Sequence, residues 1–148
     1  MSGEQNSSTE KTFLLKQIGT VEVKDGKTLI VLEKKYQPGL LGLDQFSHVF
    51  VFWWFDRNDN PRKRSILQVH PRGNPDNPLQ GVFATRAPVR PNLIGLTLCK
   101  IVSVHDNVVE VEKIDAFPGT PVLDLKPFTP GNDLPWNVRV PNWARGKH

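Results

Sequence analysis

A proline-rich loop with two arginines is the segment of this sequence best suited to bind a ligand. Arg86 and Arg90 lie four residues apart in residues 81–96, and Pro88 and Pro91 follow them closely. Proline excludes a helix here and holds the backbone in an extended, preset conformation. Because a rigid loop loses little entropy on binding, its two guanidinium groups predict a clamp for a carboxylate or another anion. A solvated basic surface loop is the alternative.

Two further loops carry groups that could contact a ligand. In residues 117–124, Gly119 lets the backbone approach a ligand closely, and Thr120 offers a hydroxyl group. From this segment alone an ordinary turn is the favoured explanation. Residues 56–60, with the sequence Asp-Arg-Asn-Asp-Asn, place polar groups at the end of an apolar segment, where an ordinary loop is again the alternative.

A short basic cluster follows these polar residues. Arg62, Lys63 and Arg64 come directly after Pro61 and predict contacts with RNA phosphates, while a solvated loop explains them equally well. The chain has 19 lysines and arginines against 15 acidic residues, a formal net charge of +4 and a pI near 9.4. This excess permits an anionic partner such as RNA without requiring one.

Metal and thiol chemistry are not expected. His48 lies in an apolar segment, and His70 and His105 lie in loops or turns, so their spacing does not indicate a metal site. Cys99 is the one cysteine, which excludes an intrachain disulfide and a cysteine cluster, and a buried inert thiol is expected. No catalytic residue is assigned from the sequence.

Short β-prone segments separated by turns must position these loops. Asp25-Gly26 between two alternating apolar runs is a strong hairpin signal, whereas 13 prolines and 11 glycines interrupt nearly every helical window. Residues 40–45 could form one helical turn. The segment 47–55 is apolar on both faces and must be covered on both sides. The expected strands are residues 13–23, 27–33, 47–55, 95–104 and 108–114.

Length and composition limit the chain to one packed domain. It has 148 residues, 38% of them hydrophobic, and needs neither disulfides nor a structural metal. The longest apolar stretch, residues 49–55, is far shorter than the roughly 20 residues of a membrane helix. The first residues lack the features of a secretory signal, which predicts a cytoplasmic protein. The strand pattern predicts an all-β fold, a closed β-barrel or a sandwich.

Three runs of sequence resemble the TsaA/TrmO-like family. They are Phe-Ala-Thr-Arg-Ala-Pro-Val-Arg-Pro-Asn-Leu-Ile-Gly-Leu-Thr (83–97), Phe-Ser-His-Val-Phe-Val-Phe-Trp-Trp-Phe (46–55) and Gly-Thr-Pro-Val-Leu-Asp-Leu-Lys-Pro-Phe (119–128). The resemblance runs in order from about Ile18 to Phe128. It implies a single closed or partly open all-β barrel that binds S-adenosylmethionine, often between two subunits. It also implies methylation of the threonylcarbamoyl-modified adenosine beside the tRNA anticodon.

The resemblance also implies which residues contact the ligands. Arg86 falls on the arginine that follows Phe-Ala-Thr, and Arg90 and Asn92 of the same loop are expected to contact the substrate. With Arg86, the implied cofactor contacts are Asp56, Arg57, Leu96, Pro118, Gly119, Thr120 and Pro121.

This chain departs from the family pattern at several of these positions. Pro118 replaces the aspartate of the family's Asp-Gly-Thr-Pro loop, and Asp56 stands where a histidine is usual. Ala87 and Leu93 replace a serine and a proline of the arginine loop. The family's Pro-Arg-Gln segment after the first strand has no counterpart before the Asp25-Gly26 turn. One edge of the cofactor site is therefore missing or comes from another segment, such as residues 136–143.

The resemblance and the composition together give a domain plan and a function. Residues 1–11 are expected to be a flexible tail, residues 12–128 the barrel, and residues 129–148 an extended tail packed on the barrel or on a second subunit. No counterpart of the C-terminal domain of longer family members is expected. A homodimer with the cofactor site near its interface is expected, with tRNA as partner. The alternatives are a module or sensor that binds S-adenosylmethionine without methylating tRNA, and a methyltransferase for a small molecule.

Overall fold

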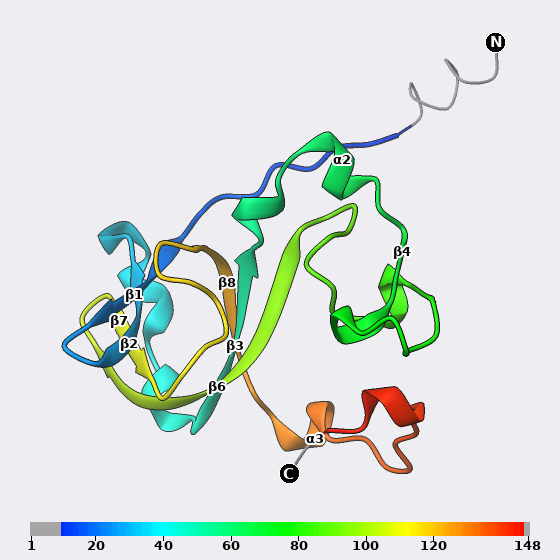
Figure 1. The fold of residues 1–148 in the computed structure, drawn as a ribbon. Coiled ribbons are helices and arrows are strands. Elements are labelled where there is room, and N and C mark those ends of the chain that lie inside the picture. The colour runs from blue at the N-terminus through cyan, green and yellow to red at the C-terminus, as the bar shows by residue number, and fades with distance from the viewer. Residues whose placement is uncertain (1–9, 147–148) are drawn as a thin grey trace.

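Six antiparallel strands form a closed barrel in the order β1-β2-β7-β6-β3-β8, as the computed structural model of residues 10–146 shows (Figure 1). The all-β barrel predicted from the sequence is thus confirmed in its closed form. The barrel strands are β1 (Gly19–Lys24), β2 (Lys27–Leu32), β3 (His48–Trp54), β6 (Ile94–His105), β7 (Val108–Val111) and β8 (Pro121–Pro127).

Both expected hairpins are present. The β1–β2 turn has positive φ at Asp25 and Gly26, 53° and 74°, which glycine and aspartate adopt at little cost in a tight hairpin. In the β6–β7 hairpin, Asp106 likewise has a φ of 55°. The expected first strand is too long, because residues 13–18 precede β1 and the pairing with β2 starts at Gly19.

Strand β3 occupies a central place in the barrel. It pairs with β6 on one side and with β8 on the other, and both pairings are antiparallel. Its side chains alternate as the sequence predicts: Val49, Val51 and Trp53 are buried in the core, while the intervening aromatic side chains are half-buried on the outer face. The other fully buried residues of the barrel core are Val21, Ile30, Cys99, Val109, Val111 and Val122. Val82 and Leu93, which lie between β3 and β6 in sequence, are also fully buried.

Residues 55–93 form a long excursion between β3 and β6 (green in Figure 1). The two ends of the excursion meet, because the Phe55 N–H donates to the Leu93 carbonyl at 2.8 Å. The excursion contains a small two-stranded sheet and single helical turns: η3 (Asp56–Asn58), α2 (Pro61–Arg64), β4 (Gln68–Val69), η4 (Pro71–Gly73), β5 (Gln80–Gly81) and η5 (Val82–Ala84).

The remaining helical turns lie between β2 and β3 and after β8. They are η1 (Lys34–Leu40), η2 (Leu43–Gln45), α3 (Pro130–Asp133) and η6 (Asn142–Ala144). The expected helical turn at 40–45 therefore spans the end of η1 and η2. Among residues 10–146, no helix has both the length and the apolar character needed to cross a membrane.

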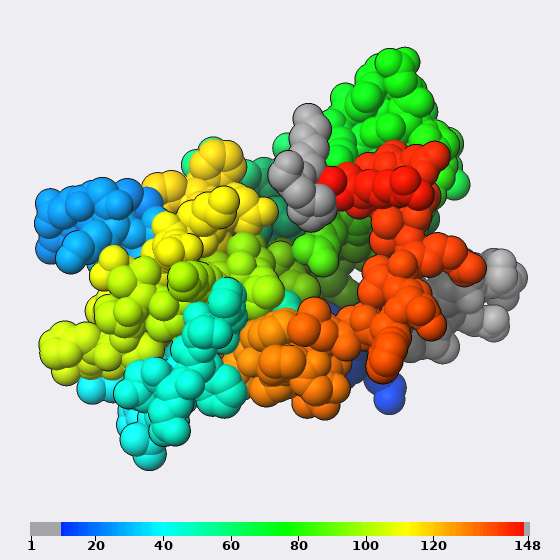
Figure 2. All heavy atoms as spheres, turned by 90° about the horizontal axis from the view of Figure 1, so that it is seen from below, coloured from blue at the N-terminus to red at the C-terminus, as the bar shows by residue number. Residues whose placement is uncertain are grey.

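The two predicted tails are only partly within the structure. Residues 1–9 of the predicted N-terminal tail and residues 147–148 lie outside the described residues. The C-terminal segment from Thr129 leaves β8 and runs beside the excursion (orange to red in Figure 2). It is not extended throughout, since α3 and η6 interrupt it.

Candidate functional site

The loops singled out in the sequence gather at one end of the barrel. Because β3 runs antiparallel to both of its neighbours, the end of β3 meets the beginnings of β6 and β8 (Figure 1). The start of the excursion after β3, its end before β6, and the loop before β8 therefore lie close together. Turns and loops at the ends of a rigid scaffold are favourable places for a binding site.

A hollow of about 610 Å³, which we call the barrel hollow, opens at this end. Its wall combines aromatic and aliphatic side chains with a few polar groups. Among the described residues that line it, Asp115 is the one acidic residue. The residues that characterise it are Trp53, Phe55, Phe83, Arg86, Arg90, Asn92, Leu96 and Asp115.

Asp115 is held in place by a short chain of hydrogen bonds. The indole N–H of Trp53 donates to the Thr97 hydroxyl at 3.1 Å, and that hydroxyl donates to the Asp115 carboxylate. Trp53 is itself fixed, since its ring lies against Gly95 so closely that a Cβ added there would stand 2.6 Å from a ring carbon. The barrel thus presents an oriented negative charge to the barrel hollow.

Cys99 lies in the core behind this carboxylate and is as buried as the sequence predicts. Burial, with a smaller contribution from the charge of Asp115, raises the pKa of the Cys99 thiol from 9.0 to about 11. A thiol with so high a pKa stays protonated at neutral pH and is a poor nucleophile.

The two loop arginines have different surroundings. Arg90 donates to the carbonyl oxygens of Val82, Thr85 and Ala87, at 3.1, 3.4 and 3.0 Å, and so ties its own loop together. Within the described chain, the Arg86 guanidinium makes no hydrogen bond or ion pair, and it remains exposed at the hollow. Arg86 is therefore free to bind an anion, whereas most of the Arg90 donors are engaged. The substrate contact of Arg90 stays a prediction.

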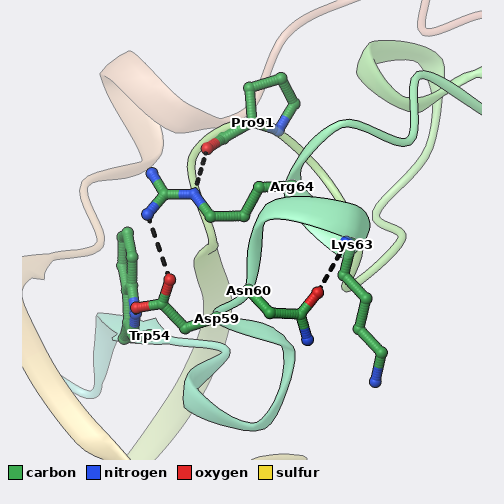
Figure 3. A network of polar contacts seen from close by, with 6 residues as sticks. All are labelled: Trp54, Asp59, Asn60, Lys63, Arg64 and Pro91. Atoms are coloured by element: carbon green, nitrogen blue, oxygen red, sulfur yellow. Dashed lines mark hydrogen bonds and ion pairs between the residues drawn. The ribbon is translucent and has the colours of Figure 1, made fainter.

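Arg64 of the basic cluster also fastens the excursion. Its Nε donates to the Pro91 carbonyl at 2.9 Å, and its Nη1 pairs with the Asp59 carboxylate at 3.2 Å (Figure 3). Its guanidinium lies 5.4 Å from the centre of the Trp54 ring, a cation–π arrangement. These contacts give Arg64 a structural role at the junction of the excursion with the barrel.

The other members of the cluster lie on the one-turn helix α2. Asn60 caps this helix by accepting from the Lys63 N–H at 2.9 Å (Figure 3), and the Lys63 ammonium donates to the Asn58 side chain at 3.1 Å. Arg62 is exposed, and its guanidinium forms no hydrogen bond or ion pair within residues 10–146, although its carbonyl accepts from the Ser65 hydroxyl at 2.7 Å. A phosphate contact by the cluster stays a prediction, with Arg62 as its freest member.

The implied cofactor residues of residues 118–121 lie at the barrel end but outside the lining of the barrel hollow. The Gly119 N–H donates to the Val21 carbonyl at 2.7 Å, and the Val21 N–H donates to the Thr120 carbonyl at 3.0 Å. Thr120 is 4% exposed. These contacts join the loop to β1 and close the barrel.

Asp56 and Arg57 are exposed and also lie beside rather than within the hollow. The Arg57 guanidinium is 4.0 Å from the centre of the Phe117 ring, which links the end of β3 to the loop that carries Asp115. Of the implied ligand residues, the structure brings Arg86, Arg90, Asn92 and Leu96 together around the barrel hollow.

A second hollow, of about 950 Å³, lies on the other side of the arginine loop. We call it the tail hollow because the C-terminal segment forms one of its walls. Phe83, Thr85, Arg86 and Pro88 border both hollows and form the partition between them. The residues that characterise the tail hollow are His70, Arg72, Phe83, Arg86, Val140 and Trp143.

Sequence reasoning did not identify Asp115, Thr97 or Phe83 as site residues. Asp115 follows β7 in an irregular stretch, and only its pairing with Thr97, which is distant in sequence, gives it an orientation. Phe83 is 80% exposed, which is unusual for a phenylalanine and is a signal visible only in three dimensions. Within the described residues, no group of three metal-ligating side chains is present.

Comparisons with known proteins agree with this fold. Residues 15–134 match the family model of the tRNA-methyltransferase O N-terminal domain. A protein of Methanocaldococcus jannaschii described as a probable S-adenosyl-L-methionine-binding protein is 44% identical over 83% of this chain and 98% of its own length. The human tRNA (adenine(37)-N6)-methyltransferase is 44% identical over 71% of this chain.

A crystal structure of TrmO from Pseudomonas aeruginosa superimposes with a TM-score of 0.70 at 26% identity, covering 90% of this chain. The chain spans 62% of that bacterial chain and 23% of the human enzyme. Because the family model matches most of the chain, this protein belongs to the family of the tRNA-methyltransferase O N-terminal domain.

Proposed function

We propose that this protein is an S-adenosylmethionine-dependent tRNA methyltransferase whose cofactor binds in the barrel hollow. The observation that carries the proposal is that one aromatic-lined hollow presents both an oriented carboxylate, Asp115, and an unengaged guanidinium, Arg86. Relatives named as S-adenosyl-L-methionine-binding proteins and as tRNA (adenine(37)-N6)-methyltransferases support both parts of it.

The residues of the barrel hollow fit such a cofactor. A volume of about 610 Å³ lies within the range of small-molecule sites. Phe83, which is 80% exposed on this wall, can stack on an adenine, and Asp115 offers a negative charge to a cationic ligand. Asn92 and Arg86 can hydrogen-bond to hydroxyl and carboxylate groups.

When bound, the cofactor supplies an activated methyl group. The residues of this chain then orient the two reactants and exclude water, which are the main requirements of an in-line displacement at carbon. Arg86, on the partition between the two hollows, can hold a carboxylate of either ligand by bidentate contacts. Methylation of an acceptor nitrogen also releases its proton, and no residue of the hollow is assigned as the base that takes it.

We propose the threonylcarbamoyl-modified adenosine of tRNA as the methyl acceptor. Its threonyl carboxylate matches the Arg86 guanidinium in charge and geometry. We also propose a cytoplasmic location, which the sequence predicts and which is compatible with action on tRNA. The shorter archaeal relatives named only for S-adenosyl-L-methionine binding favour the sensor alternative, so binding and methyl transfer require separate tests.

Isothermal titration tests cofactor binding. S-adenosylmethionine should bind the protein saturably, and Arg86→Ala should weaken binding about tenfold, because a hydrogen bond to a charged group contributes roughly 1.5–3 kcal/mol. Lys27→Ala, which removes an exposed charge at the β1–β2 turn, is the matched control and should bind normally. Absence of binding at millimolar ligand would reject the cofactor site.

Methyl transfer is tested with radiolabelled cofactor and tRNA that carries or lacks the threonylcarbamoyl group. Transfer to the modified tRNA alone is expected. Transfer to neither tRNA, with cofactor binding intact, would favour the sensor, and transfer to a small-molecule extract would favour the third alternative.

We further propose a homodimer whose interface lies beside the barrel hollow. The outer face of the barrel carries a row of apolar side chains on β3 and β6, and Leu98 on it is 44% exposed. Leu96, its neighbour on the same face, lines the hollow. The predicted alternative is cover by the C-terminal tail, and Phe128, directly before this tail, has its ring centre 6.2 and 5.9 Å from those of His48 and Phe50.

Light scattering after size exclusion tests this association. A dimer is expected, and Leu98→Asp should convert it to a monomer, because a carboxylate is costly to bury in an apolar interface. Val102→Asp is the matched control on the same strand, beyond its pairing with β3. A monomeric protein at all concentrations would contradict the proposal.

A further inference from the structure

The tail hollow differs from the barrel hollow in the origin of its walls. One wall is the excursion, with η4 and the arginine loop, and the other is the C-terminal segment that carries Val140 and Trp143. The match to the family ends at residue 134, so this second wall is an addition outside the matched domain. In Figure 2 the red end of this segment lies next to the green excursion.

The lining of the tail hollow is aromatic and cationic. Phe83 is largely exposed on the partition, and Trp143 is half-buried on the opposite wall. Arg72 and Arg86 add positive charge, and no aspartate or glutamate is present among the lining residues. Flat rings beside cations, without a carboxylate, suit a ligand that is both planar and anionic.

The polar groups of this lining are available to a ligand. Within residues 10–146 neither Arg72 nor Arg86 donates a hydrogen bond or forms an ion pair, in contrast to Arg64 and Arg90. His70 places its Nδ1 2.8 Å from the Asn77 carbonyl, and because a carbonyl only accepts, Nδ1 carries the proton. Its Nε2 is left for another contact.

We infer that the tail hollow is the acceptor pocket, which takes the target nucleotide of RNA together with its phosphate. The base stacks on Phe83 and Trp143, and Arg72 binds the phosphate. Because the two hollows share the Phe83–Arg86 partition, a nucleotide in the tail hollow lies beside a methyl donor in the barrel hollow. This inference rests on the proposed function and makes the C-terminal segment part of the substrate site.

Fluorescence anisotropy at fixed salt tests the pocket, with a labelled anticodon stem-loop RNA carrying the threonylcarbamoyl-modified adenosine as the probe. Trp143→Ala should raise the Kd about tenfold, within the range known for loss of one stacking contact. Trp143→Phe should restore most of the affinity, because it keeps a ring. Trp136→Ala is the matched control, since Trp136 belongs to the same segment but is 90% exposed and outside the hollow.

A second pair of variants distinguishes a specific phosphate contact of Arg72 from a general effect of positive surface charge on RNA binding. Arg72→Gln should weaken RNA binding about tenfold, whereas Lys27→Gln, which removes one positive charge from the exposed β1–β2 turn, should change it less than about threefold. Equal losses in the two variants, or in Trp143→Ala and Trp136→Ala, would overturn the acceptor pocket.

Titration of S-adenosylmethionine into the same variants distinguishes the two proposals. Trp143→Ala and Arg72→Gln should bind the cofactor as the unchanged protein does. If they lose cofactor binding and keep RNA binding, the tail hollow holds the cofactor and the inference is wrong. If the unchanged protein binds RNA through Trp143 but does not bind the cofactor, the pocket stands and the methyltransferase proposal fails.

Discussion

The barrel hollow and the tail hollow share a partition but are supported by different kinds of structure. The barrel hollow rests on β3 and β6, and its carboxylate is oriented through Trp53 and Thr97, both in paired strands. The tail hollow lies between a loop and a terminal segment and presents cations without internal partners. The difference fits the proposed assignment of the barrel hollow to a small cationic cofactor and of the more adaptable tail hollow to a large anionic substrate.

Among the variants that test this difference between the two hollows, Gly95→Ala is expected to have the largest effect. The added Cβ would stand 2.6 Å from the Trp53 ring, so the indole must move and disturb the support of Asp115. Overpacking of this kind destabilises by roughly 1–3 kcal/mol. We expect a lower Tm and the greatest loss of cofactor affinity of the four variants discussed, with RNA binding largely kept. Gly39→Ala, where a Cβ meets open space, is the control. Normal cofactor binding in Gly95→Ala would show that the Trp53 support is unimportant.

Arg86→Ala should affect both hollows at once. Its guanidinium borders each of them, so we expect about tenfold weaker binding of the cofactor and of the RNA, measured by titration and by anisotropy. Arg72→Gln is the comparison, since Arg72 borders the tail hollow alone. A loss confined to one ligand would assign Arg86 to one hollow and contradict its role as a shared residue.

Asp115→Asn should change ligand binding in the barrel hollow and leave the tail hollow unaffected, because Asp115 lines only the barrel hollow. The substitution removes the negative charge and keeps an oxygen for the Thr97 hydroxyl. S-adenosylmethionine should bind several-fold more weakly, a loss of about 1 kcal/mol, while uncharged-sulfur S-adenosylhomocysteine is affected less. RNA binding should be unchanged. Glu112→Gln, an exposed carboxylate outside the hollow, is the control. Equal weakening of both cofactor forms would mean that the carboxylate does not face the sulfonium.

Cys99→Ala should leave both hollows intact and reduce the dependence of stability on alkaline pH. The thiol has its pKa raised from 9.0 to about 11 in the fold, so the folded protein retains this proton more strongly than the unfolded chain. The resulting stabilisation is complete below pH 9 and is lost as the pH rises toward 11, a difference of roughly 2–3 kcal/mol. Urea unfolding across this pH range should show a steeper loss in the unchanged protein than in Cys99→Ala. Parallel pH profiles would contradict the buried, protonated thiol.

The parts of the fold that local sequence could predict are those with local causes. The Asp25-Gly26 turn specifies its hairpin because both residues tolerate positive φ. The apolar 47–55 segment identifies strand β3, which is buried on one face and half-buried on the other. Strand β8, by contrast, was not foreseen, because prolines stand at both of its ends and its partners β1 and β3 are distant in sequence. Long-range pairing selected this strand where local propensity did not.

The site was predictable in position more than in detail. The sequence singles out the arginine loop and the polar end of β3, but their meeting at one barrel end follows from the antiparallel pairing of β3 with β6. Whether a guanidinium is free depends on which carbonyls the folded loop turns toward it, so the engagement of Arg90 and Arg64 could not be read from their spacing. The orientation of Asp115 likewise depends on Thr97, a residue of another element.

The meeting of Phe55 and Leu93 has a consequence for how the barrel and its loops can vary. Since the backbone hydrogen bond between these residues closes the excursion at its base, β3 and β6 form a hairpin that is complete without the residues between them. The excursion is in effect an insertion into a hairpin turn, and insertions at such points are well tolerated by a scaffold. Exchange of this one contiguous segment can therefore reshape the walls that it contributes to both hollows, while the barrel strands β3 and β6 stay the same.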